Sequence, residues 1–98
     1  MTALRPDLAA IAAHIPVGAR VLDVGCGDGA LMAALRDQKG IDARGMELDA
    51  TNVADAVTRG LAVVAFGRGN IPPAIVPALR AAVDAGVFVS VSSRAVSG

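Results

Sequence analysis

This sequence of 98 residues has few cysteines and few aromatic residues, and it has no net charge. The single cysteine, Cys26, excludes an internal disulfide and any metal site built from several cysteines. Only Phe66 and Phe88 are aromatic, so the core must be aliphatic. Nine basic residues balance nine acidic ones, and the basic residues are spaced singly along the chain. That spacing excludes a cationic patch for nucleic acid or anionic lipid.

Long apolar stretches are absent as well. No run approaches the ~20 residues that span a bilayer, and no basic segment followed by an apolar segment opens the chain. These absences predict a cytoplasmic protein that carries no targeting signal and does not contact a membrane. The length is that of one domain, so we expect residues 1–98 to fold as a single unit.

Short apolar runs and helical spacings alternate along the chain. A leading helix is expected over Pro6–His14, where apolar residues recur on one face. Nearly continuous apolar runs predict four strands that are buried on both faces: Arg20–Val24, Ala43–Leu48, Leu61–Phe66 and Val87–Val91. Helices are expected between them. This alternation predicts an α/β fold with a four-stranded parallel sheet and right-handed crossovers.

A glycine-rich loop, Asp23-Val24-Gly25-Cys26-Gly27-Asp28-Gly29, follows the first expected strand and opens a helix. Glycine permits positive φ and lets a ligand approach the backbone closely. The amino end of the helix then offers free N–H groups to an anion. About twenty residues later Glu47 ends the second expected strand, where a carboxylate can accept both hydroxyls of a ribose. The alternative is a tight turn without a ligand and a solvated glutamate.

Two further residues of this loop have other interpretations. Asp23 can serve a structural role by accepting backbone N–H groups of its own loop. Cys26 lies near a helix amino terminus, which can lower the pKa of a thiol, but the sequence offers no partner base. We therefore expect no catalytic residue here and no metal site.

Residues Leu4–Val64 resemble the MetW family of methyltransferase-fold proteins linked to methionine biosynthesis. The resemblance runs without a gap through the Asp23–Gly29 loop and the Gly45-Met46-Glu47 segment. It implies that the loop lies under the methionine part of S-adenosylmethionine and that Glu47 holds the ribose. The cofactor-binding residues it implies are Asp23, Gly25, Gly27, Gly29 and Glu47.

Residues Leu61–Gly98 resemble a different family, the C-terminal domain of bacterial L-asparaginases. The similarity lies in Gly67-Arg68-Gly69-Asn70, in the helix that follows, and in Ser92-Ser93-Arg94. In asparaginases the nucleophilic threonines belong to the other domain, so this resemblance implies no catalytic residue. Together the two resemblances predict a chimera, with a methyltransferase-like fragment over residues 1–63 and an asparaginase-like fragment over residues 64–98.

The two resemblances also predict the topology. We expect a Rossmann-like three-layer α/β/α sandwich with strand order 3-2-1-4, in which Val87–Val91 lies beside Arg20–Val24. The alternative places Val87–Val91 beside Leu61–Phe66. The exposed edges of such a sheet favour a homodimer.

The functional prediction follows from the missing parts. The chain stops before an acceptor pocket or a catalytic motif on the fourth strand can form. The sequence therefore predicts an engineered chimeric scaffold that is not an enzyme, requires no cofactor and retains weak binding of S-adenosylmethionine or S-adenosylhomocysteine. The alternative is a methyltransferase-like protein of methionine biosynthesis that depends on S-adenosylmethionine.

Overall fold

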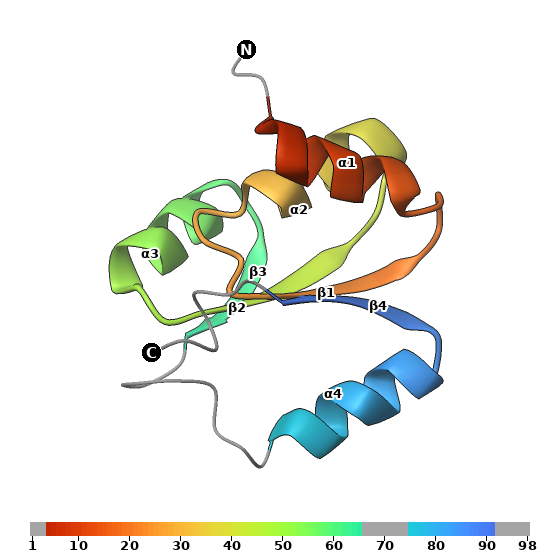
Figure 1. The fold of residues 1–98 in the computed structure, drawn as a ribbon. Coiled ribbons are helices and arrows are strands. Elements are labelled where there is room, and N and C mark those ends of the chain that lie inside the picture. Colours follow the sequence, from red (N-terminus) through yellow and green to blue (C-terminus); the bar gives the residue numbers. More distant parts are fainter. Residues whose placement is uncertain (1–3, 66–74, 92–98) are drawn as a thin grey trace.

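A computed structural model describes residues 4–65 and 75–91. Helices and strands alternate in it after a first helix (Figure 1), in the order α1 (Pro6–His14), β1 (Arg20–Val24), α2 (Ala30–Lys39), β2 (Ala43–Glu47), α3 (Ala50–Thr58), β3 (Ala62–Ala65), α4 (Ile75–Asp84) and β4 (Val87–Val91). The bounds of α1, β1 and β4 are those predicted. β2 ends one residue earlier than expected, and β3 begins at Ala62 rather than Leu61.

The strands form one parallel sheet in the order β3-β2-β1-β4, as predicted. β4 pairs with β1 from Arg20 opposite Val87 to Val24 opposite Val91, which excludes the alternative position beside β3. Helices α1, α2 and α3 lie on one side of the sheet and α4 lies on the other (Figure 1). This arrangement is the predicted three-layer α/β/α sandwich.

Local sequence explains where the helices begin and end. Pro6 is the first residue of α1, a position where its missing N–H is not needed. The side chain of Asp49 caps α3 by accepting hydrogen bonds from the backbone N–H groups of Thr51, at 2.8 Å, and Asn52, at 3.1 Å. α2 ends at Lys39, and the φ of 62° at the next residue, Gly40, suits the left-handed residue that closes a helix.

The sheet face under α1, α2 and α3, here called the three-helix face, carries the main core. Leu31, Met32 and Leu35 of α2 lie at its centre, and each is at most 2% exposed. The full set of buried side chains in this cluster is Ala12, Ile15, Val21, Cys26, Leu31, Met32, Leu35, Ile41 and Ala43. Aliphatic residues thus fill the core, as the scarcity of aromatic residues requires.

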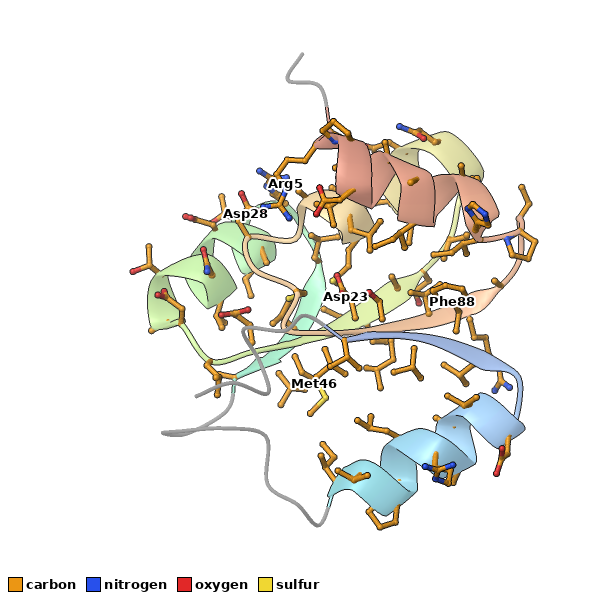
Figure 2. All side chains as sticks on the ribbon, in the orientation of Figure 1. Arg5, Asp23, Asp28, Met46 and Phe88 are labelled. Atoms are coloured by element: carbon orange, nitrogen blue, oxygen red, sulfur yellow. The ribbon has the colours of Figure 1, made fainter. Side chains whose placement is uncertain are left out.

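The opposite face, here called the α4 face, is much more open. Val24 is the one fully buried residue of its cluster, and Met46 beside it is partly buried (Figure 2). Among the described residues, none of α4, β3 or β4 is buried, and Val64 on β3 is 61% exposed. The prediction that all four strands are buried on both faces is therefore wrong for the edge strands, because a single helix cannot cover a four-stranded sheet.

Several predicted features lie outside the described residues. They are Phe66 at the end of the third expected strand, the segment Gly67–Asn70 and the segment Ser92–Arg94. Within the described ranges, no helix has the length and apolar character needed to cross a bilayer.

Candidate functional site

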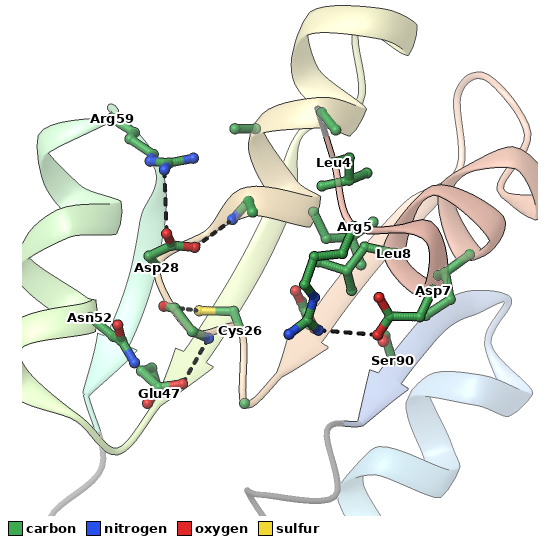
Figure 3. Close-up of a pocket in the computed structure, with 18 of the residues that line it drawn as sticks. Leu4, Arg5, Asp7, Leu8, Cys26, Asp28, Glu47, Asn52, Arg59 and Ser90 are labelled. Atoms are coloured by element: carbon green, nitrogen blue, oxygen red, sulfur yellow. Dashed lines mark hydrogen bonds and ion pairs between the residues drawn. The ribbon is translucent and has the colours of Figure 1, made fainter. Parts of the chain in front are cut away.

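A cavity of about 1550 Å³ opens at the carboxyl ends of the strands (Figure 3). Its lining comes from the loop after β1, the ends of β2 and β4, α1, α2 and the first turn of α3. In the order β3-β2-β1-β4, β2 and β3 follow on one side of β1, and β4 lies on its other side. The cavity therefore lies at the topological switch point. Open α/β sheets bind their ligands at this place.

The glycine-rich loop is fixed to the neighbouring strand by its backbone. The N–H groups of Gly25 and Cys26 both donate to the carbonyl oxygen of Met46, at 2.7 and 3.0 Å. Gly25, Gly27 and Gly29 have φ values of 77°, 59° and 87°, which L side chains rarely adopt. The loop therefore needs glycine at all three positions for its own conformation, whether or not a ligand binds.

Gly27 and Gly29 differ in their surroundings. A Cβ atom on Gly29 would lie 2.4 Å from Leu61 Cδ1 and 3.2 Å from Ala56 Cβ, so this glycine lets the loop pack against α3. A Cβ atom on Gly27 would meet nothing within 4 Å. Of the two, Gly27 is the one with open space in front of its backbone, into which a ligand can move.

Glu47 is buried, with 8% of its surface exposed, and it joins two segments of the site. Its Oε1 accepts a hydrogen bond from the N–H of Gly27 at 2.8 Å, and its Oε2 accepts one from the N–H of Asp49 at 2.9 Å. Glu47 is therefore not a solvated strand end. Its carboxylate holds the glycine-rich loop against the start of α3.

Asp23 is also buried, at 5% exposed, and its side chain lines the cavity. It makes no side-chain hydrogen bond with any residue that the structure describes, so the expected bonds to its own loop are not observed there. Burial, and secondarily the charge of Glu47, raises the pKa of Asp23 to about 6. The sheet places Ser90 of β4 directly beside it in register.

Cys26 does not behave as a reactive thiol. It is 8% exposed, and its Sγ donates a weak hydrogen bond to the carbonyl oxygen of Gly27 at 3.6 Å. Burial raises the pKa of the thiol to about 12, and the charges of Asp23 and Glu47 act in the same direction. The raised pKa keeps the sulfur protonated at neutral pH, which removes its nucleophilic form.

The rim of the cavity carries two ion pairs (Figure 3). Arg5 Nη2 lies 3.1 Å from Asp7 Oδ2 at the start of α1. Arg59 Nη2 lies 3.4 Å from Asp28 Oδ2, between the end of α3 and the glycine-rich loop. The side chains of the Arg5–Asp7 pair are largely exposed and those of the Arg59–Asp28 pair are nearly half exposed, so each pair contributes little to stability.

The sequence interpretation missed several residues that line the cavity. They are Arg5, Asp7 and Leu8 of α1, Asn52 of α3 and Ser90 of β4. Ser90 could have been found, because it is the one polar residue in the Val87–Val91 strand and lies near its carboxyl end. The α1 residues carry no such signal, since their place depends on how α1 packs. Among the described residues, no group of His, Cys, Asp or Glu side chains is arranged to hold a metal ion.

Comparison with solved structures defines the class of protein. The chain resembles a SAM-dependent methyltransferase from Geobacter sulfurreducens in complex with S-adenosylhomocysteine, with 27% identity and a TM-score of 0.52 over 66% of this chain and 30% of that chain. A second such enzyme, from Thiobacillus denitrificans and also in complex with S-adenosylhomocysteine, is 29% identical, with a TM-score of 0.53. The match covers 66% of this chain and 29% of that chain. The TehB-like SAM-dependent methyltransferase of Corynebacterium glutamicum is 28% identical, with a TM-score of 0.55. The match covers 67% of this chain and 38% of that chain. The fold is that of a Rossmann-like methyltransferase.

The family is more specific than the fold. Residues 5–70 match the model of the family described as methionine biosynthesis protein MetW, and the chain belongs to this family. No curated protein matches the chain. The chain spans about a third of the length of the solved structures it resembles.

These findings correct the functional prediction made from the sequence. The expectation that the protein is not an enzyme is wrong, because both the family match and the solved neighbours point to a methyltransferase. The family match also runs past the expected junction between residues 63 and 64. Neither the family match nor these neighbours support an asparaginase-like fragment, a chimera or an engineered origin.

Proposed function

We propose that this chain is the part of a MetW-family methyltransferase that binds S-adenosylmethionine, and that Asp23, Gly25, Gly27, Gly29 and Glu47 form the binding site. The observation that carries the proposal is the position of Glu47. Its carboxylate lies at the edge of a cavity at the switch point of the sheet and already orders the loop that a ligand would contact. Two of the solved neighbours contain S-adenosylhomocysteine.

The residues present fit this ligand. Each carboxylate oxygen of Glu47 accepts one backbone hydrogen bond, which leaves further lone pairs for the two hydroxyls of a ribose. The open side of Gly27 lets the ligand approach the backbone. When bound, S-adenosylmethionine supplies an electrophilic methyl group on a sulfonium ion.

The methyl acceptor is a separate question. The neighbours are about twice as long as this chain, so in such enzymes residues beyond the matched segment can contribute to acceptor binding. We propose that methyl transfer belongs to the whole protein and serves methionine biosynthesis, in keeping with the family description. The contribution of residues 4–65 is to bind and orient the donor.

Calorimetric titration with S-adenosylmethionine and S-adenosylhomocysteine tests donor binding. We expect both to bind, and we expect Glu47→Ala to weaken both by roughly tenfold to hundredfold, because it removes a buried acceptor. Glu47→Gln keeps the size of the side chain and tests the same acceptor if the alanine variant folds poorly. Asp42→Ala is the matched control, because Asp42 is exposed and pairs with Arg44 away from the cavity.

Two outcomes would overturn the proposal. One is a wild-type protein that binds neither nucleoside at millimolar concentration. The other is binding that Glu47→Ala, Glu47→Gln and Asp42→Ala leave equally unchanged, which would place the ligand somewhere other than at Glu47.

A further inference from the structure

The cavity is strongly acidic. Among its described lining residues, carboxylates outnumber guanidinium groups, and both arginines, Arg5 and Arg59, are already paired with carboxylates. The acidic residues of the lining are Asp7, Asp23, Asp28, Asp37, Glu47 and Asp49. Such a cavity favours a ligand of positive charge over a neutral one.

Asp23 is the acidic group best placed to distinguish such ligands. Glu47 accepts two backbone hydrogen bonds, Asp49 caps α3, and Asp7 and Asp28 pair with arginines. Asp23 has no such partner among the described residues, although it is 95% buried and lines the cavity. A largely buried carboxylate that has no cationic partner gains free energy when a cation comes near it.

We propose that Asp23 makes the cavity bind the cationic methyl donor more tightly than its neutral product, so that the product is released after the reaction. S-adenosylmethionine carries one positive charge more than S-adenosylhomocysteine, on the sulfonium sulfur. The two ligands are otherwise alike apart from the methyl group. This inference rests on the proposed function, since it requires that both ligands bind in this cavity.

The register of the sheet supports a role for Asp23 distinct from that of Glu47. Asp23 lies on β1 opposite Gly45 of β2, two residues before Glu47 and one strand away. Neighbouring strands are about 4.8 Å apart, and the sulfonium is bonded to the carbon next to the ribose ring. A Coulomb attraction acts over this range without direct contact.

Few other charges surround Asp23. From β2 it is faced by Glu47, and from the loop by the Cys26 thiol, which is also close to Asp28. From α1 the cavity receives Arg5 and Asp7, which pair with each other, and β4 contributes only the neutral Ser90 at the adjacent position. α4 lies on the other side of the sheet (Figure 1).

The test compares the two dissociation constants in the wild type and in Asp23→Asn. We expect the wild-type preference for S-adenosylmethionine over S-adenosylhomocysteine to fall by about tenfold in the variant, chiefly through weaker binding of S-adenosylmethionine. Asp37→Asn is the matched control. It removes the same charge from the wall of the same cavity, but Asp37 is exposed and pairs with Arg36 at 3.0 Å, so the preference should stay unchanged.

The preference should also depend on pH. As pH rises from about 5 to about 7.5, Asp23 ionises and the preference of the wild type for the cationic ligand should increase. In Asp23→Asn the preference should stay level over that interval. Titration of the amino acid group shared by the two ligands cancels in the ratio.

The outcomes separate this inference from the proposed function. If neither ligand binds the wild type, the proposed function fails. If both bind and Glu47→Ala weakens both, but Asp23→Asn and Asp37→Asn leave the preference the same, the role of Asp23 is wrong. A preference for the neutral ligand in the wild type would overturn the inference as well.

Discussion

The two faces of the sheet differ in how completely they are covered. The three-helix face buries nine side chains in one cluster, whereas the α4 face buries only Val24 among the described residues. In the described ranges, the buried apolar residues lie between Ala12 and Ala56, within the segment that matches the family. This segment therefore supplies most of the core, whereas α4 and β4 add a thinner layer on the α4 face.

The cavity belongs to the better packed side. Asp23 points to the three-helix face, and Met46, next to Glu47 in sequence, points to the α4 face (Figure 2). Side chains alternate along a strand, so the residues that line the site stand on the same face as the core that supports them. A rigid core beneath the loop holds the site in place.

The largest effect is expected from a pair of identical substitutions on the two faces. Leu35 is 1% exposed on the three-helix face, and Leu79 is partly buried on the α4 face. Leu35→Ala should lower the free energy of unfolding by about 2–5 kcal/mol, the usual result of a cavity in a closed core. Leu79→Ala should lower it by less than half as much, because its site is already open. Urea denaturation of both variants measures these free energies of unfolding. Equal losses would show that the two faces are equally well packed.

A second pair compares two glycines of the same loop. Gly29→Ala should lower the free energy of unfolding by about 2–4 kcal/mol for two reasons. The new Cβ would crowd Ala56, and the alanine would have to adopt a positive φ. Gly27→Ala has only the conformational penalty, about 1–2 kcal/mol. Thermal denaturation ranks the two. A larger loss at Gly27 would show that the loop does not pack on α3 as described.

A third prediction concerns Asp23, one of the two charged residues that are buried among the described residues. Burial raises the pKa of Asp23 from 3.8 to about 6, so the unfolded chain releases this proton first as pH rises. The stability of the wild type should therefore fall between these two values and then level off. The asparagine side chain in Asp23→Asn does not ionise, so the stability of this variant should not fall over this interval. The variant should be more stable by up to about 3 kcal/mol near pH 7.5, with no gain below about pH 4.

Chemical denaturation of Asp23→Asn and the wild type across this pH interval measures the difference. A constant difference at every pH would show that Asp23 does not titrate between the two values. A variant that is less stable near neutral pH would show that the carboxylate has a stabilising partner.

Much of the fold could be predicted because the signals are local. Pro6 and the apolar spacing after it define α1, and the apolar runs define β1 and β4. The sequence also placed the glycine-rich loop and Glu47 at the same edge of the sheet, because parallel strands end there, and Gly27 and Glu47 do lie in contact. The exposure of Val64 could not be predicted, because an apolar run does not say how many helices will cover it.

Other properties depend on contacts between distant segments. The hydrogen bonds that Glu47 accepts from Gly27 and Asp49 form only when β2 ends beside the loop after β1. The pKa of Asp23 depends on its burial and on Glu47, which are set by the packed sheet. The predicted lack of activity was wrong for a different reason. It treated the change of resemblance after Val64 as the loss of the enzyme, although the family match extends to residue 70.

The two hydrogen bonds to Glu47 have a thermodynamic consequence for recognition. Fixing the backbone of one residue removes conformational entropy equivalent to about 1–2 kcal/mol. Because Glu47 already immobilises the loop at Gly27 and the entry to α3 at Asp49, this loss occurs during folding rather than during association. A ligand that meets such a preorganised loop keeps more of its contact energy as affinity. The same carboxylate thereby links the folding equilibrium to the binding equilibrium.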